Sequence, residues 1–205
     1  MVDYFVRGGA FMWPILIALI IGVMFSIERF YSLTRSKINA RKFVQKIVDA
    51  LGKGDGAKNA MDVCDNTHGP LANVTKAGLS RIDRGIEEVE KAIGASGTIE
   101  MAFLERNLVW LSTIVSVAPM LGFLGTVAGM VGAFDAIQKA NDISPSLVAG
   151  NISVALLTTM FGLIVAIIIQ FAHNYFVSVI DKIVVDMEES TQEIVEQLIK
   201  SNNTH

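Results

Sequence analysis

The chain alternates between long stretches without charged residues and stretches in which charges recur. The uncharged stretches cover residues 10–27, 107–134 and 143–180, which are 18, 28 and 38 residues long. A helix needs about 17 to 25 mostly apolar residues to cross the hydrocarbon core of a bilayer. Each stretch is long enough for one crossing. The pattern therefore predicts an all-α integral membrane protein with three transmembrane helices.

The third uncharged stretch is longer than a bilayer is thick. At 1.5 Å per residue, a helix over residues 143–180 would measure about 57 Å, against a hydrocarbon core of about 30 Å. Part of this helix must project beyond the membrane. In residues 181–205, apolar positions at helical spacing alternate with acidic ones. This pattern predicts an amphipathic helix that packs in a bundle, because a membrane-surface helix would carry a basic polar face.

The segment over residues 28–106 carries recurring charges, with apolar residues at helical intervals between them. Gly52, Gly56, Gly69 and Pro70 interrupt this pattern, as turns between short helices do. The segment shows no phosphate-binding loop and no nucleophile with a base nearby. We expect a small helical module here, and we do not expect the chain to be an enzyme.

The distribution of Lys and Arg predicts the orientation, because cations concentrate in the cytoplasmic flanks of membrane helices. Arg7 alone precedes the first uncharged stretch, and Lys139 is the one cation of the loop between the second and third stretches. Six cations crowd the far side of the first stretch. These are Arg29, Arg35, Lys37, Arg41, Lys42 and Lys46. The N-terminus is therefore expected outside and the C-terminus in the cytoplasm.

Together these patterns divide the chain into seven parts. Transmembrane helices are expected over residues 10–27, 107–136 and 147–180, the last with a cytoplasmic extension. The outside parts are residues 1–9 and 137–146, and the cytoplasmic parts are the module 28–106 and the C-terminal helix 181–205.

The first uncharged stretch does not resemble a cleaved signal peptide. Such a peptide needs a basic N-terminal region, a short apolar stretch and a small-residue cleavage site. Here the apolar stretch is longer, and it continues directly into Glu28-Arg29 without an Ala-x-Ala-like sequence. We expect a retained membrane anchor.

The single cysteine, Cys64, has no partner for an internal disulfide and lies in the segment expected in the reducing cytoplasm. Cys64 and His68 are four residues apart and would share a helix face. Two ligands without a third are weak evidence for a metal ion. Neither a metal nor a cofactor is predicted.

The second membrane stretch carries glycines at three- and four-residue steps, so that they form one stripe along a helix. They are Gly122, Gly125, Gly129 and Gly132. Small residues at such steps let helix backbones approach closely in lipid. Helix packing is therefore the first interpretation, and the stripe is expected to supply the close contact of an assembly. Thr126, at its edge, is the only hydroxyl side chain between Ser116 and Ser144.

The third membrane stretch carries a second stripe, of polar and small residues within about 80° of each other. Its members are Ala155, Thr159, Gly162, Ala166, Gln170 and His173. Thr158 is displaced from it by one residue. A hydroxyl inside a membrane helix most often bonds to a carbonyl of its own helix. A polar stripe that runs along most of a span instead favours an ion path or a partner, and we select Thr126, Thr158, Thr159, Gln170 and His173 as path residues.

The second and third membrane stretches contain no Asp, Glu or Lys. Proton movement through a membrane generally uses such an ionisable carrier. If the chain takes part in ion transport, the titrating group must therefore come from another polypeptide. The polar stripes would then form a track around it.

Three segments resemble the signatures of the MotA/TolQ/ExbB channel proteins, which are the multi-copy subunits of flagellar stators and of the Ton and Tol systems. The first runs from Gly8-Gly9 through Trp13-Pro14-Ile15 to Glu28-Arg29-Phe30. The second covers residues 118–127 and the third residues 155–163. The three spans and the modest cytoplasmic part are similar to the ExbB/TolQ branch, because flagellar stators have four spans.

The resemblance implies a bacterial inner-membrane motor that couples ion flow to mechanical work. It implies a homo-pentamer around two copies of a single-span partner of the ExbD/TolR kind, whose helix carries the ion-binding Asp. It also implies a TonB/TolA-like energy-transducing protein as a further partner, and no nucleic acid. Thr126 and Thr159 match the two pore-facing threonines of the family.

The sequence departs from the family pattern at Val154, where ExbB and TolQ commonly carry a Glu. The ion path is expected to be drier at this level. The pair Thr158-Thr159 also resembles sodium-driven stators, which leaves the coupling ion open. The proton is expected first, with sodium as the alternative. Two other functions stay open: a structural membrane scaffold, and a component of a solute transporter, which would be expected to show repeats or broken helices.

Overall fold

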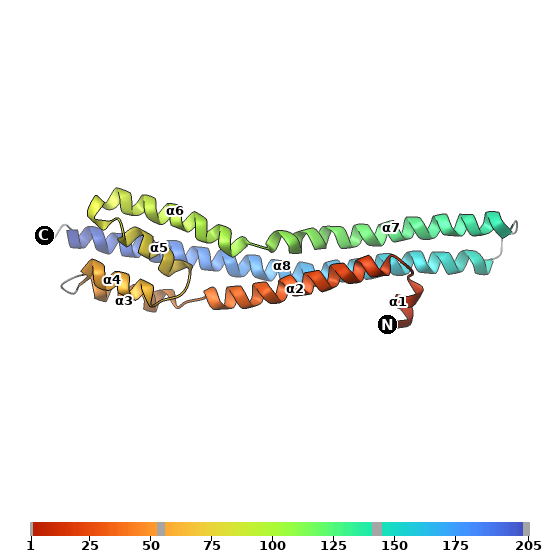
Figure 1. Cartoon of the computed structure of the whole chain (residues 1–205), viewed down its shortest axis with the longest axis horizontal. Helices are drawn as coiled ribbons and strands as arrows, with labels where there is room; N and C mark the ends of the chain where they lie inside the picture. The colour runs from red at the N-terminus through yellow and green to blue at the C-terminus, as the bar shows by residue number, and fades with distance from the viewer. Residues whose placement is uncertain (1, 53–55, 141–144, 203–205) are drawn as a thin grey trace. The chain divides into compact units, whose positions relative to one another are not determined.

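The computed structural model describes residues 2–52, 56–140 and 145–202, and within these ranges the chain is built from helices alone (Figure 1). The α-helices are α1 (Val2–Arg7), α2 (Met12–Ser36), α3 (Ala40–Leu51), α4 (Gly56–Asp65), α5 (Pro70–Leu79), α6 (Ile86–Glu105), α7 (Leu108–Ala140) and α8 (Pro145–Asn202). A short 3-10 helix, η1, covers Ile82–Arg84. Three helical stretches of the described residues are long and apolar enough to cross a membrane.

The helices do not end where the uncharged stretches end. α2 continues past residue 27 to Ser36, and α8 runs without a break into the acidic tail as far as Asn202. The loop expected over residues 137–146 is helical at 137–140 and 145–146, while 141–144 lie outside the described residues. A helix leaving the membrane keeps its hydrogen bonds in water, so a change in polarity marks the bilayer surface and not the end of the helix.

The chain divides into two units, each with its own packing. The membrane unit comprises Met1–Arg29 and Asn107–Tyr175, and the bundle unit comprises Phe30–Arg106 and Phe176–His205.

In the membrane unit, α7 and α8 pack backbone to backbone along the glycine stripe. A Cβ atom built at Gly122 would lie 2.9 Å from the Cα of Thr159, and one at Gly129 would lie 2.8 Å from the Cβ of Ala155. As the residue numbers increase along α7, the numbers of the α8 residues that they contact decrease, so the two helices are antiparallel. The stripe therefore packs within a single chain, and the contacts of an assembly have to come from other faces.

Those other faces are apolar and open. Phe123 on α7 is 67% exposed and Phe171 on α8 is 75% exposed, and α2 presents Trp13, Ile20 and Ile27 in the same way. Aromatic and aliphatic faces of this size are expected to be covered by lipid or by other chains.

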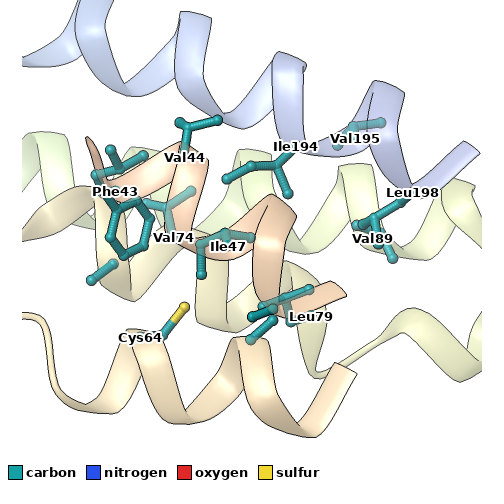
Figure 2. Packing of buried hydrophobic residues seen from close by; sticks show 14 of the residues in the cluster. Phe43, Val44, Ile47, Cys64, Val74, Leu79, Val89, Ile194, Val195 and Leu198 are labelled. Carbon is teal, nitrogen blue, oxygen red and sulfur yellow. The ribbon is translucent and has the colours of Figure 1, made fainter. Parts of the chain in front are cut away.

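In the bundle unit, a buried core joins α3, α4, α5 and α6 to the last part of α8 (Figure 2). Figure 2 shows Ile194, Val195 and Leu198 of α8 facing the side chains of the shorter helices, among them Val89 of α6. The apolar residues of the acidic tail are thus buried in a helical bundle. Within this bundle, α3 is capped by Asn39, whose side-chain oxygen accepts a hydrogen bond of 3.1 Å from the backbone N–H of Lys42.

Cys64 lies in this core with 4% of its surface exposed. Burial, and to a lesser extent the negative charge of Asp65, raise the pKa of its thiol from 9.0 to about 11, against the opposing effect of Lys76. Only the thiolate reacts with alkylating reagents, so the folded chain is expected to protect this cysteine.

Replacing Gly122 by Ala is expected to destabilise the membrane unit, because the added methyl group meets the backbone of α8 at Thr158 and Thr159. Overpacking of this kind costs about 1–3 kcal/mol. Gly132→Ala is the matched control, because a Cβ there would lie 3.8 Å from the nearest atom, Oδ1 of Asn151. Thermal unfolding in detergent should show a lower midpoint for Gly122→Ala and little change for Gly132→Ala. Equal midpoints would contradict the packing.

Alkylation of Cys64 by iodoacetamide at pH 8 is expected to be at least about 100-fold slower in the folded chain than in denaturant. The rise in its pKa from 9.0 to about 11 reduces the thiolate fraction by that factor, and burial slows the reaction further. The chain has one cysteine, so mass spectrometry of the intact protein reads this rate directly. Similar rates in the two states would show that Cys64 is not in the core.

Candidate functional site

The candidate site is the part of the α7–α8 contact that carries the threonines selected from the sequence. Gly122 brings the backbone of α7 close enough for α8 side chains to reach it. The hydroxyl of Thr159 donates a hydrogen bond of 3.0 Å to the carbonyl oxygen of Gly122. The hydroxyl of Thr158 lies 3.3 Å from the same oxygen and 2.7 Å from the carbonyl oxygen of Ala155 in its own helix. One carbonyl of α7 therefore meets both threonines.

The two neighbouring threonines differ in burial. Thr158 is 1% exposed, because Gly125 lies directly against it: a Cβ at Gly125 would lie 2.6 Å from the Cβ of Thr158. Thr159 is half-buried. A step of one residue turns a helix by 100°, so one hydroxyl is sealed inside the helix contact while its neighbour lies at the edge.

Thr126 lies one helical turn beyond Gly122 on α7 and is half-buried as well. Its hydroxyl donates a hydrogen bond of 2.5 Å to the carbonyl oxygen of Phe123. A hydroxyl that donates to a carbonyl keeps lone pairs with which it accepts. Thr126 and Thr159 therefore each keep an acceptor oxygen at the edge of the contact, which suits a protonated carboxyl or a cation.

Gln170 and His173 lie at another level of α8. They follow Thr159 by 11 and 14 residues, which is about 16 and 21 Å along a helix. The side-chain amide of Gln170 donates a hydrogen bond of 2.7 Å to Oδ1 of Asn174. Nδ1 of His173 is buried and has no hydrogen-bond partner within the described ranges. The structure therefore does not bring these two residues together with the threonines.

The remaining glycines of the two stripes differ in how closely they pack against the other helix. Gly162 packs against Gly122, since a Cβ there would lie 3.1 Å from the Cα of Gly122. Gly132 lies further along α7, where the helices are less tightly packed. Val154 is half-buried, and its Cγ1 would lie 3.7 Å from a Cβ at Gly9. Val154 therefore faces the turn that precedes α2.

A charged cluster at the edge of the membrane unit was not selected from the sequence. Arg29 is 2% exposed and donates two hydrogen bonds to Glu28, at 2.7 and 2.6 Å. The side-chain amide of Asn107 donates to Oε2 of Glu28 at 3.2 Å. Asn107 has a φ of +67°, a left-handed conformation that few residues other than Gly adopt. The hydrogen bond from Asn107 to Glu28 holds the residue that precedes α7 in place. In the sequence, only the signature Glu28-Arg29-Phe30 pointed to this cluster.

Over residues 2–52, 56–140 and 145–202, no three His, Cys, Asp or Glu side chains are grouped so as to hold a metal ion.

Comparison with known proteins places this geometry in context. The chain is 32% identical over 180 residues to a putative biopolymer transport protein ExbB homolog of Methanothermobacter thermautotrophicus, covering 87% of this chain and 63% of the relative. It is 28% identical over 182 residues to the putative biopolymer transport protein ExbB-like 1 of Synechocystis, covering 87% and 71%. It is 35% identical over 89 residues to the Tol-Pal system protein TolQ of Haemophilus influenzae, covering 43% and 39%.

The chain thus spans less than two thirds of the first of these relatives. The family match itself covers more than half of the chain, and it includes α5, α6, α7 and most of α8. Residues 66–189 match the sequence pattern that defines the MotA/TolQ/ExbB proton channel family, and the chain therefore belongs to this family, with the ExbB/TolQ-like proteins as its relatives.

Proposed function

We propose that the chain is the multi-copy channel subunit of an inner-membrane motor, which couples ion flow to mechanical work or energy transduction across the cell envelope. The observation that carries the proposal is the pair of half-buried hydroxyls, Thr126 and Thr159, in the uncharged stretches 107–134 and 143–180, which contain no Asp, Glu or Lys. Such a surface solvates a charge that another chain brings. It has no carrier with which to move protons alone.

In this proposal the carrier is the Asp of a single-span ExbD/TolR-like partner. An ionised carboxylate inside a membrane costs several kcal/mol unless polar groups meet it. The acceptor oxygens of Thr126 and Thr159 suit the protonated carboxyl, and their hydroxyl protons can turn from the carbonyls of Phe123 and Gly122 toward the carboxylate when it ionises. The threonines thus provide a partner for both states.

The exposed apolar faces support an assembly. Five copies around two copies of the partner would cover the faces of α7 and α8 that carry Phe123 and Phe171. A ring requires a heterologous interface that closes on itself. The α7–α8 contact is already filled within each chain, so it provides a rigid wall for such a ring. A TonB/TolA-like protein is the proposed receiver of the mechanical work.

The proton is the favoured coupling ion. The carbonyl oxygen of Gly122 accepts from the hydroxyl of Thr159 at 3.0 Å and, inside α7, from the backbone N–H one turn further on. Both of its lone pairs are therefore used, and it is not free to coordinate sodium as backbone carbonyls do in sodium-coupled transporters. Sodium remains the alternative ion. For orientation we propose an N-terminus outside and a C-terminus in the cytoplasm, on the strength of the cations that follow the first membrane stretch.

A structural scaffold is the second candidate. It is favoured by the observation that the hydroxyls of Thr126, Thr158 and Thr159 all donate to backbone carbonyls, as packing residues in membrane helices do. A solute transporter is less favoured, because α8 has no break over Pro145–Asn202.

Thr159→Val is expected to leave assembly intact and to abolish transduction, because it keeps the volume and β-branching of the side chain but removes its oxygen. Thr158→Val is the matched control, because the hydroxyl of Thr158 is buried in the helix contact and the hydroxyl of Thr159 still donates to the carbonyl oxygen of Gly122. We expect at least about a tenfold loss of ion-driven activity for Thr159→Val, partial activity for Thr159→Ser, and near-normal activity for Thr158→Val. Activity and partner binding are measured on the same sample. Full activity of a partner-bound Thr159→Val complex would contradict a path role for this hydroxyl.

The chain alone is expected to conduct poorly. In proteoliposomes with an imposed proton gradient, a pH-sensitive dye should report at least about tenfold less flux for the chain alone than for the chain reconstituted with its Asp-bearing partner. The matched control is the same complex with the partner's Asp replaced by Asn. Equal flux with and without the partner would contradict the argument from the missing carboxylate.

A further inference from the structure

The bundle unit contains a cavity that the proposed channel function does not use. It has a volume of about 300 Å³ and lies between the end of α2, the start of α5 and the first turns of α8 that belong to this unit. Its polar lining comes from Ser36, Lys37, Ser178, Lys182 and Asp186. Its apolar lining includes Ile38, Leu71, Val179, Ile183 and Met187.

The wall of the cavity is built by a close approach that requires a glycine. Gly69 has a φ of +143°, and a Cβ there would lie 3.1 Å from Cγ2 of Ile38 and 3.4 Å from the carbonyl oxygen of Ser36. The turn before α5 therefore packs directly on the link between α2 and α3. Met187 on the opposite wall is 5% exposed and belongs to the buried core. Both walls are fixed by packing, so the space is preformed.

The lining selects for an anion with an apolar part. The two lysines outnumber the one carboxylate, and Ser178 offers a hydroxyl donor, whereas the hydroxyl of Ser36 already donates to the carbonyl oxygen of Ser32 at 3.0 Å. Arg35 and Arg41, which flank this segment in the sequence, are exposed and add positive charge nearby. A small soluble anion would leave the five apolar side chains named above without apolar contacts. A lipid headgroup that continues into methylene groups would contact them.

The place of the cavity along the chain indicates where such a molecule comes from. Ser36 is the last residue of α2, the first membrane helix, and Ser178 and Val179 are among the last residues before the charges of the α8 tail begin at Asp181. Basic pockets beside membrane helices on the cytoplasmic side are suited to anionic lipid headgroups. We propose that this cavity binds the phosphate-bearing headgroup of an anionic phospholipid, with Lys37 and Lys182 as its charged contacts. The proposal does not require that the chain conduct ions.

The test is native mass spectrometry of the full-length chain, purified in detergent and titrated with phosphatidylglycerol or phosphatidylcholine. We expect the wild type to bind at least about tenfold more phosphatidylglycerol than phosphatidylcholine, and Lys37→Gln/Lys182→Gln to lose this preference. Lys42→Gln/Lys46→Gln is the matched control, because both residues are exposed on α3 and neither lines the cavity. It should bind phosphatidylglycerol as the wild type does.

A second variant separates the cavity from general surface attraction. Ser178→Leu keeps both lysines and fills the space, so it should lose phosphatidylglycerol while its unfolding temperature stays close to that of the wild type. Inorganic phosphate, added as a competitor at the lipid concentration, should displace less than about a tenth of the lipid. Equal phosphatidylglycerol binding by all variants would overturn the proposal. Displacement by phosphate at equal concentration would also overturn it, because the site would then be one for a soluble anion.

Discussion

The membrane unit depends on the contact between the backbones of α7 and α8 at Gly122. In lipid there is no hydrophobic force to drive two apolar helices together, so close packing and interhelical hydrogen bonds have to do so. The absence of a side chain at Gly122, Gly125 and Gly129 permits the approach. The hydroxyls of Thr158 and Thr159 then reach a carbonyl of the neighbouring helix. The same contact determines which threonine is sealed and which remains at the edge.

This contact also determines which surfaces of the membrane unit stay open to lipid or to other chains. At the Gly122 contact the interacting residues are small or hydroxyl-bearing, while Leu111, Ile114 and Ile169 are buried elsewhere in the membrane unit. Other large apolar side chains, such as Phe123 and Phe171, are exposed. The surface left open is therefore apolar, with two threonine oxygens at its margin and without a carboxylate on α7 or α8 between Asn107 and Phe134 or between Ile152 and Ile180. A surface of this kind is suited to meet a charged group from a partner helix. The backbone contacts between α7 and α8 hold the two threonine oxygens in place.

Much of the architecture was predictable from the sequence because it follows from one-dimensional patterns. The uncharged stretches gave the three membrane helices, which the structure confirms, and three motifs gave the family, which the comparison with known proteins confirms. The ends of the helices were less predictable. The sequence analysis expected separate parts over residues 147–180 and 181–205, whereas the structure has one unbroken helix, Pro145–Asn202. The helix that packs against the glycine stripe was not predictable either. Small residues indicate a close helix contact, but they do not show whether the second helix is α8 of the same chain or a helix of another chain.

The finer parts of the site needed the structure. The sequence places Thr159 on the polar stripe and Thr158 one residue away from it, but only the position of Gly125 shows that Thr158 is the sealed one. The cluster of Glu28, Arg29 and Asn107 joins residues 79 positions apart, and the left-handed conformation of Asn107 leaves no periodic signal. The cavity beside Lys37 and Lys182 likewise arises from helices that are distant in sequence.

The central claim is that Thr159 presents its oxygen to a carboxylate that belongs to another chain. An experimental structure of the complex with its single-span partner tests this most directly. The account predicts that, in at least one copy, the partner's Asp lies within about 3.2 Å of Oγ1 of Thr159, with the contact at Gly122 intact. A complex in which the Asp lies more than about 6 Å from Thr159 and Thr126 in every copy, beyond hydrogen-bond reach even through a water, would contradict it.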